Sequence, residues 1–357
     1  MVKANLVICL FVTACVPARL EPFLVGKGAM AINPPDLVRA LDGAQDTAAK
    51  VSLGNWIAEN FKASTPSSPA GYQVIFPIDC LGFYSPEYFD RLEPTFRYKV
   101  IGLKNHPIEG IGVPLIGIRE NRHQSPVEKW YPPEGITRAV TAVAVPGTIH
   151  NHVRRVEIRL IDRNHTETYG KHHAELAGNF TVPYAALLEK AGSLDLSGIT
   201  SMIHIIPDRR PAFYLVEPYD PNRTQVIFIH GLISTPLAWA ELTNELWAVP
   251  EIRRRYQIWH YLYPTNPPAL YSARIMRGQL DELRHFLDPK GNNPAMQRTV
   301  LVTHSMGGLL GKTLAIEPKD AFWDAVFTRK LWSMNVTPTE RDTLIEAFCW
   351  KPRGNVD

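Results

Sequence analysis

The strongest constraint on this chain is a short apolar run that leads directly into a serine among small residues. The run is residues 299–302, Thr-Val-Leu-Val, and residues 303–308 continue it as Thr-His-Ser-Met-Gly-Gly. An apolar run of this length followed by glycines predicts a buried strand, a tight turn, and a helix that begins at Met306. Ser305 is then expected at the tip of the turn, with its hydroxyl exposed. We call residues 303–308 the serine turn.

The last part of the chain alternates strand and helix patterns. Strands are expected at 226–230, 258–262 and 300–303, and helices at 236–247, 272–287 and 306–316. This alternation is typical of a parallel sheet, and right-handed crossovers place strand 226–230 between the other two. The carboxyl ends of parallel strands share one rim, so the loops that follow them are expected to meet there.

A serine hydroxyl becomes a useful nucleophile where a base takes its proton and hydrogen-bond donors stabilise the resulting oxyanion. Two backbone N–H groups are expected to be these donors for Ser305. One belongs to Met306, at the positive end of the following helix. The other is that of Leu232 in the sequence His-Gly-Leu at 230–232, which we call the oxyanion loop. Gly231 permits the backbone conformation that turns this N–H inward.

The remaining residues of these two motifs have supporting roles. We expect Gly307 to leave room where the new helix approaches the sheet, and Thr303 stands where the common pattern has glycine. His230 is expected to brace the oxyanion loop. His304 neighbours the nucleophile along the turn, so its side chain is expected to point away from Ser305, into the sheet environment. Neither histidine is expected to be the base.

With these motifs the chain resembles bacterial serine esterases and lipases of the α/β-hydrolase superfamily, with Ser305 as the nucleophile. The features that carry the resemblance are residues 226–232, Trp239, residues 261–264 and residues 303–309. The resemblance covers about 211–348 well and the N-terminal half only loosely. Within the superfamily the chain most resembles lipoprotein-like hydrolases with a β-rich N-terminal region, and more distantly deacylases that act on lipid anchors. The resemblance implies hydrolysis of esters or amides through an acyl-serine intermediate, without a metal ion or an organic cofactor.

The sequence departs from that family after the serine. Its members continue with further strands that deliver an Asp or Glu and then a histidine, whereas the last histidine here is His304. Asp320, Asp324 and Asp342 lie in segments expected before those strands, so none is a natural triad acid. We therefore expect a partial α/β-hydrolase parallel sheet, truncated after the nucleophile helix. Strand 300–303 becomes an open edge, which predicts self-association.

Three functional hypotheses remain open at this point. The first is a serine hydrolase acting on carboxylic esters, impaired here because the triad Asp and His are absent. The second is a catalytically inactive, lipid-anchored binding or scaffold protein of α/β-hydrolase descent, and the third is an enzyme completed by another chain. An acyl or lipid-like substrate is favoured by apolar residues that would also serve as core: Leu232, Ile233, Leu237, Trp239, Met306, Leu309 and Leu310.

The first fifteen residues have the pattern of a signal peptide that ends in a lipobox. Lys3 precedes an apolar run at 4–12, which is too short to span a bilayer, and Cys15 stands where a lipidated cysteine belongs. The alternatives are a plain secretory signal and a buried N-terminal segment. The prediction is a lipid-anchored protein of a bacterial cell envelope, or a periplasmic or secreted one. Without the signal, Cys80 and Cys349 would allow one disulfide.

Composition and patterning predict the remaining organisation. A net charge of +3 and a charged content of 20% argue against a nucleic-acid partner, and a hydrophobic content of 45% is ordinary for a globular protein. Residues 16–75 read as a loop and helical segment, with helices at 35–48 and 51–61. Residues 76–210 read as a β-rich accessory domain, with strands at 98–103, 112–118, 138–145, 156–161 and 200–206 and a helix at 184–191. Residues 211–357 form the expected hydrolase domain.

Overall fold

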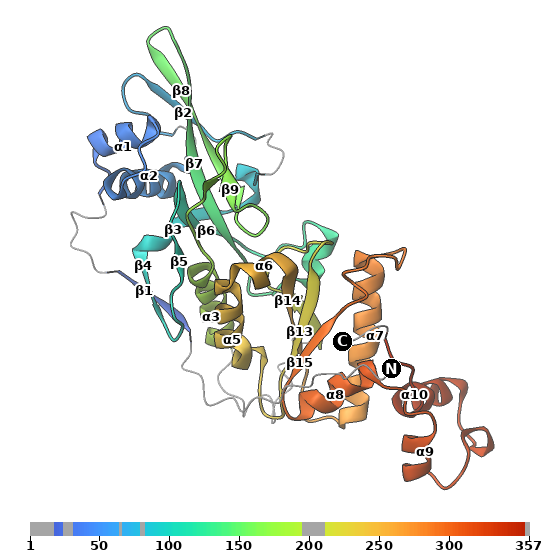
Figure 1. The fold of residues 1–357 in the computed structure, drawn as a ribbon. Helices are drawn as coiled ribbons and strands as arrows, with labels where there is room; N and C mark the ends of the chain where they lie inside the picture. Colours follow the sequence, from blue (N-terminus) through green and yellow to red (C-terminus); the bar gives the residue numbers. More distant parts are fainter. Residues whose placement is uncertain (1–17, 24–30, 64–65, 79–82, 195–210, 354–357) are drawn as a thin grey trace. The chain divides into compact units, whose positions relative to one another are not determined.

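The protein is a mixed α/β chain with two separate compact units (Figure 1). The computed structural model describes residues 18–23, 31–63, 66–78, 83–194 and 211–353. The N-terminal unit contains the described residues up to 194 together with 244–249, and the C-terminal unit contains residues 211–243 and 250–353. In these ranges no helix combines the length and the apolar character needed to cross a membrane. The predicted signal peptide and Cys15 lie outside the described residues.

A curled five-stranded sheet forms the centre of the N-terminal unit. Its order is β2 (Tyr72–Ile75), β8 (Val153–Asp162), β7 (Ile136–His150), β6 (Val113–Arg119) and β3 (Arg91–Pro94), and only β2 pairs in parallel. The sheet is flanked by α1 (Pro34–Leu41), α2 (Thr47–Asn60) and α3 (Thr181–Leu194). Short pairs complete the unit: β1 (Arg19–Pro22) with β4 (Tyr98–Ile101), β5 (Pro107–Ile108) with β11 (Gly178–Asn179), and β9 (Thr168–Tyr169) with β10 (Ala174–Glu175). Its 3-10 turns are η1 (Pro86–Tyr88), η2 (Thr95–Arg97) and η3 (Pro126–Trp130).

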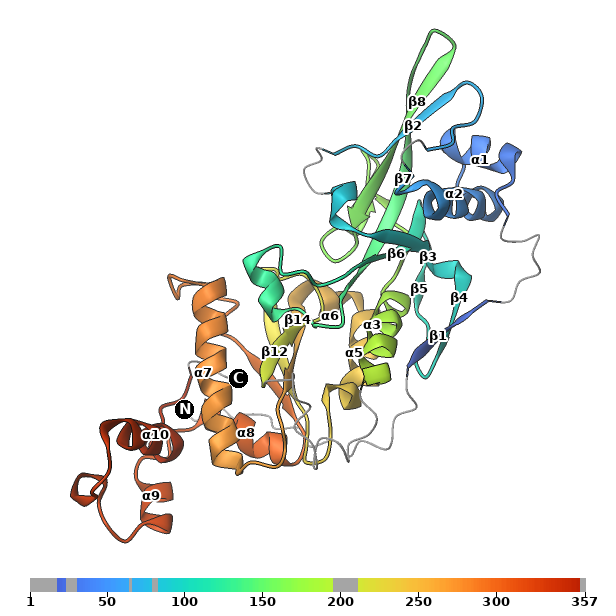
Figure 2. The same ribbon diagram turned by 180° about the vertical axis from the view of Figure 1, so that it is seen from behind.

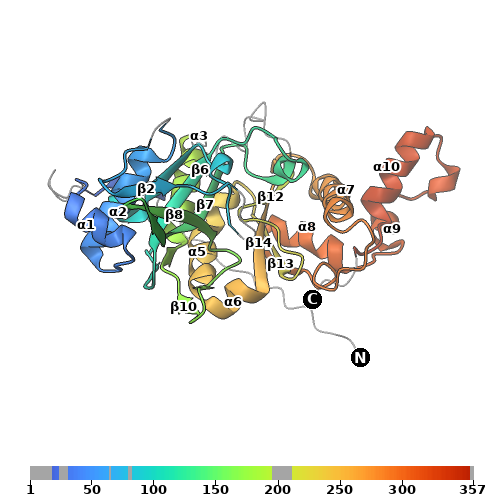
Figure 3. The same cartoon turned by 90° about the horizontal axis from the view of Figure 1, so that it is seen from above.

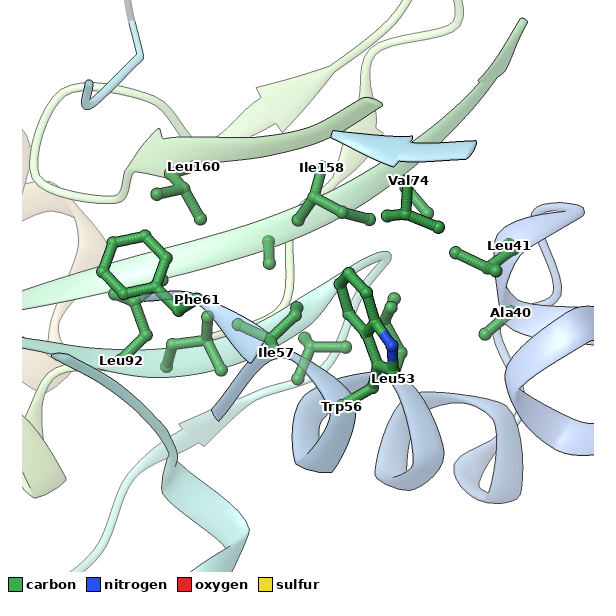
Figure 4. Packing of buried hydrophobic residues seen from close by; sticks show 14 of the residues in the cluster. Ala40, Leu41, Leu53, Trp56, Ile57, Phe61, Val74, Leu92, Ile158 and Leu160 are labelled. Atoms are coloured by element: carbon green, nitrogen blue, oxygen red, sulfur yellow. The ribbon is translucent and has the colours of Figure 1, made fainter. Parts of the chain in front are cut away.

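One hydrophobic core joins α1 and α2 to the sheet (Figure 4). Trp56 and Ile57 of α2 lie in the same buried cluster as Val74, Ile158 and Leu160 of the strands. The indole N–H of Trp56 donates to the carbonyl oxygen of Ser67 at 2.7 Å, which fixes the segment between α2 and β2 to the helix. Burial of each such side chain stabilises the unit by about 1.5–3 kcal/mol. Segments that differ in composition therefore share one core.

The strands predicted at 98–103, 112–118, 138–145 and 156–161 are confirmed as β4, β6, β7 and β8. The helix predicted over 35–48 is confirmed for residues 35–41, in α1, but its continuation to 48 as one helix is wrong. Gly43 has a φ of +99°, which ends α1, and the Asp46 side chain accepts a hydrogen bond from the Ala49 N–H at 3.2 Å to begin α2. The strand predicted at 200–206 lies outside the described residues.

A small mixed sheet forms the centre of the C-terminal unit. Its order is β12 (Ala212–Leu215), β14 (Tyr256–Leu262), β13 (Thr224–Ile229) and β15 (Val300–Thr303). The last three strands are parallel, and β13 lies between β14 and β15 as predicted. The expectation of a wholly parallel sheet is corrected, because β12 pairs antiparallel with β14. The described residues contain no complete α/β-hydrolase sheet.

Helices lie on both faces of this sheet. Figure 3 shows α7 (Ala269–Leu287) and α8 (Met306–Ala315) on one side of β13 and β14 and α6 (Pro250–Arg255) on the other. The turn η4 (Pro236–Trp239), which leads into α5 (Ala240–Ala248), contacts β13 and β14. Phe228 faces this turn and stacks on Trp239 with ring centroids 5.2 Å apart. Ile229, the next residue, faces α8, because strand side chains alternate.

The chain after α8 forms helices only, among the residues described. These are α9 (Ala321–Val326), η5 (Leu331–Ser333) and α10 (Pro338–Phe348), and Figure 2 shows α10 beside α7. The two helices are joined by an ion pair between Arg274 Nε and Glu346 Oε2 at 2.6 Å. Arg277 of α7 is buried and lies over the Trp350 ring, 4.8 Å from its centroid. The C-terminal helices are therefore docked on α7 and add no strand beside β15.

Candidate active site

Ser305 has a strained backbone and an exposed side chain at the junction of β15 and α8. Its φ is 51° and its ψ is −120°. A non-glycine residue in such a region costs on the order of 1–3 kcal/mol, and such residues cluster at functional sites. The turn is closed by hydrogen bonds from the Gly307 N–H to His304 O and from the Gly308 N–H to Ser305 O, both 2.8 Å. The sequence-predicted turn thus presents the hydroxyl to solvent.

Two glycines allow the oxyanion loop and the serine turn to touch. A Cβ atom on Gly307 would overlap the carbonyl oxygens of Ile229 and His230. A Cβ atom on Gly231 would lie 2.5 Å from His304 Nδ1 and 3.2 Å from Ser305 Cβ. A larger residue at 307 would have to displace the backbone of β13, whereas one at 231 would have to displace the His304 ring. The loop after β13 therefore passes directly against the predicted nucleophile.

The two expected oxyanion donors remain available. Among the described residues, neither the Leu232 N–H nor the Met306 N–H donates a hydrogen bond to another group. Ile233, which follows the loop, has a φ of +53°, a conformation that a β-branched residue rarely adopts. The Ile233 N–H donates to the Thr265 hydroxyl at 3.3 Å, which stabilises this conformation from the loop after β14.

His230 is buried and neutral. Its Nδ1 lies 3.0 Å from the Gly231 carbonyl oxygen, and its Nε2 lies 3.4 Å from the Tyr263 backbone N–H. Burial lowers the pKa of His230 to about 4, so the ring is uncharged at neutral pH. The Tyr263 hydroxyl donates to the His230 carbonyl oxygen at 2.8 Å, and the two rings stack. With both ring nitrogens engaged, His230 holds the loop and has no free site to act as a base.

His260, on β14, is a second buried histidine that the sequence interpretation did not consider. Its Nε2 lies 3.3 Å from the Thr243 hydroxyl. Burial, with a smaller effect of the nearby His230, lowers its pKa to about 3. Its ring lies 5.4 Å from that of Phe228, on the face opposite α8. The sequence signal that could have revealed this buried ring is a histidine directly between a tryptophan and a tyrosine in an apolar strand of the sheet interior.

No base accompanies the serine in the described part of the chain. None of its side chains hydrogen-bonds to Ser305 Oγ. His304 is half-buried and lies against Gly231, so its ring packs on the oxyanion loop rather than in the sheet as expected. Asp320, Asp324 and Asp342 are exposed, and Asp324 pairs with Lys330 at 3.1 Å.

The apolar residues that were expected to favour an acyl or lipid-like substrate divide into buried and exposed groups. Trp239 and Leu310 are buried core residues, and Leu237 and Met306 are half-buried. Leu232, Ile233 and Leu309 are exposed by 50%, 41% and 61%. Leu309 lies in the first turn of α8, four residues after Ser305, so the two residues lie on the same face of the helix. We call these three exposed residues, two from the oxyanion loop region and one from the first turn of α8, the apolar border.

No protein-family model, no curated protein and no solved structure matches this chain. The functional argument therefore depends on local geometry. Within the described ranges, no group of three or more His, Cys, Asp or Glu side chains could hold a metal ion. Cys349 is a free, half-buried thiol, while Cys80 lies outside the described residues.

Proposed function

We propose that this chain is a serine hydrolase of the α/β-hydrolase type that acts on carboxylic esters through an acyl-serine at Ser305. In this proposal the small mixed sheet is part of an α/β-hydrolase sheet. The observation that carries the proposal is the backbone of Ser305, held at a φ of 51° and a ψ of −120° between a parallel strand and a helix. Strain of this kind persists only where the surrounding structure enforces it, and the turn uses it to expose a hydroxyl.

The reaction follows from the groups around that hydroxyl. Ser305 Oγ attacks the carbonyl carbon of the ester, the serine proton leaves, and negative charge develops on the carbonyl oxygen. The N–H groups of Leu232 and Met306 stabilise that oxygen. Collapse of the tetrahedral intermediate expels the alkoxide, which takes a proton from water, and leaves the acyl group on Ser305; hydrolysis by a second water then gives the carboxylic acid and regenerates the serine hydroxyl. The exposed Leu232, Ile233 and Leu309 favour an acyl or lipid-like substrate.

None of the described residues is placed to act as the base that removes the serine proton. A serine site that lacks one triad member is slower by on the order of 10⁴. We therefore infer that the described residues alone give slow acylation, which increases with pH as hydroxide takes the proton. The same observation favours a second candidate function, a lipid-anchored binding or scaffold protein that retains the apolar border without turnover. Lipidation at Cys15 and a location in a bacterial envelope also remain proposals.

Replacement of Ser305 by cysteine tests the first function. A thiol has a pKa of about 8.5, so a cysteine supplies its own anion and needs no base. If the oxyanion donors are in place and only the base is lacking, S305C will release p-nitrophenol from p-nitrophenyl butyrate at pH 8.5 in a burst. The burst should be at least about tenfold faster than the reaction of the parent chain. The measurement is stopped-flow absorbance.

A second cysteine variant is the matched control. Ser333 is exposed on η5, so S333C gives the reactivity of an ordinary surface thiol in the same chain. S305C should exceed S333C, because only the former has oxyanion donors beside it. Equal rates in the two folded variants would contradict an acyl-transfer site and favour the binding protein. A parent chain as fast as S305C would show that a base reaches Ser305.

A further inference from the structure

The imidazole of His230 contacts backbone groups on two sides, one in its own oxyanion loop and one in the residue that follows β14. The ring is buried and stacks on the Tyr263 ring with centroids 4.4 Å apart. The Tyr263 backbone N–H donates to His230 Nε2 at 3.4 Å, and His230 Nδ1 lies 3.0 Å from the Gly231 carbonyl oxygen. Each ring nitrogen therefore faces one backbone group, and the stacking keeps the ring in this plane.

These two contacts determine which ring nitrogen carries the proton. A backbone N–H can only donate, so Nε2 accepts from Tyr263 and carries no proton in the neutral ring. Nδ1 then carries the proton and donates to the Gly231 carbonyl oxygen, which can only accept. The other neutral tautomer would set two donors against each other at Tyr263 and two acceptors at Gly231. Burial lowers the pKa of His230 to about 4, so the ring is neutral and keeps this tautomer at neutral pH.

The hydrogen bond to the Gly231 carbonyl oxygen also orients the Leu232 N–H. Both groups belong to one planar trans peptide, so they point in opposite directions. Gly231 has no Cβ atom, and its own backbone therefore restrains the rotation of this peptide only weakly. Because His230 holds the carbonyl oxygen toward the buried ring, the Leu232 N–H is turned away from that ring.

We propose that His230 is a positioning residue for acyl transfer, whose Nδ1–H fixes the peptide that carries the Leu232 oxyanion donor. The inference rests on the proposed function and assigns the effect to one ring nitrogen. The peptide is a close neighbour of the nucleophile, because a Cβ atom on Gly231 would lie 3.2 Å from Ser305 Cβ. A peptide rotated by half a turn would direct its carbonyl oxygen away from the ring instead, and that oxygen would repel the developing negative charge.

Two amide side chains separate the roles of the ring nitrogens. The amide nitrogen of asparagine is as many bonds from Cβ as His230 Nδ1, and the amide oxygen of glutamine is as many as Nε2. In the S305C background, H230N can still donate to the Gly231 carbonyl oxygen. H230Q can accept from the Tyr263 N–H but leaves that carbonyl oxygen without its donor. Loss of one oxyanion donor slows an enzyme by about 10²–10³, so we expect the p-nitrophenol burst of H230Q to be at least about tenfold slower than that of H230N.

The controls separate this effect from a general loss of packing. H230N and H230Q both remove a buried ring, so both should lower the urea unfolding midpoint, and only the burst should divide them. His260 is a buried histidine that contacts the Thr243 hydroxyl and not the oxyanion loop. H260Q should therefore lower the midpoint without slowing the S305C burst. Equal bursts in folded H230N and H230Q would overturn the proposal.

Nitrogen NMR of the parent chain, labelled with ¹⁵N-histidine, tests the tautomer without any reaction. The His230 signals are identified by their absence from the two variants, and we expect a protonated Nδ1 and an unprotonated Nε2 at neutral pH. The opposite tautomer, or a ring that exchanges between both, would overturn the proposal. A protonated Nδ1 in a chain whose S305C variant gives no burst would contradict the proposed function and support the peptide orientation, so the two failures are distinguishable.

Discussion

Replacement of Trp239 by alanine is expected to lower the free energy of unfolding of the C-terminal unit by about 3–5 kcal/mol. The side chain is 1% exposed and stacks on Phe228 of the central strand β13. Its removal leaves a cavity between the sheet and η4, the turn that follows the loop carrying Leu232. Urea unfolding followed by circular dichroism measures the change, and S305C burst rates measured in the same background show whether the oxyanion loop loosens.

The matched control is Trp239→Phe. Phenylalanine keeps the stacking surface, and the indole N–H that it removes has no hydrogen-bond partner among the described residues. A substitution that conserves most of the volume and loses no hydrogen bond should cost less than about 1.5 kcal/mol. Equal losses in the two variants would contradict the view that the ring fills this position mainly by packing.

Replacement of Gly307 by alanine is expected to destabilise the same unit by about 2–3 kcal/mol, although alanine favours a helix over glycine by about 1 kcal/mol. The new Cβ atom meets the backbone carbonyls of Ile229 and His230, which cannot rotate away as a side chain would. The start of α8 must therefore move from β13, and the Met306 N–H moves with it. We expect a lower unfolding midpoint and a loss of the S305C burst.

Gly308→Ala is the control for Gly307→Ala. It makes the same chemical change one residue later, where the new Cβ atom would lie 3.5 Å from the Thr303 hydroxyl, an ordinary contact. This variant should be neutral or slightly stabilised, because alanine is the better helix former. If Gly308→Ala were as destabilised as Gly307→Ala, helix packing in general would explain the loss, and the close approach of β13 would not.

The strand–helix alternation of the C-terminal unit could be predicted from the sequence, because each element carries its own pattern. The apolar runs became β13, β14 and β15, and the order of these strands followed from crossover handedness. In each case short-range information was sufficient.

Features that depend on distant contacts could not be predicted in this way. β12 has four residues and is recognised only through its pairing with β14. The common core of α1, α2 and the five-stranded sheet was hidden, because the segments differ in composition and both helices precede the first strand of that sheet, β2. Gly43, by contrast, is a local signal of a helix end, and the prediction of one helix over 35–48 did not take it into account.

The candidate site shows the same division. The motif predicted that Ser305, Gly231 and Gly307 lie at one rim, and the contacts of the two glycines place the loops together. The hydrogen bonds that hold the oxyanion loop were not predictable: the Tyr263 hydroxyl donates to the His230 carbonyl oxygen, and the Thr265 hydroxyl accepts from the Ile233 N–H. Their positions follow from the register of β13 with β14, which a single sequence does not specify.

The most direct test of the central claim is peptide mapping of the chain after reaction with a fluorophosphonate at pH 9. The account predicts a slow adduct on Ser305 that is absent from Ser305→Ala. Ser333, an exposed serine whose hydroxyl donates to the Lys330 carbonyl at 2.8 Å, should remain unmodified in the same digest. An adduct spread equally over Ser305 and Ser333, or no adduct on Ser305 in the folded chain, would contradict the assignment of Ser305 as a nucleophile.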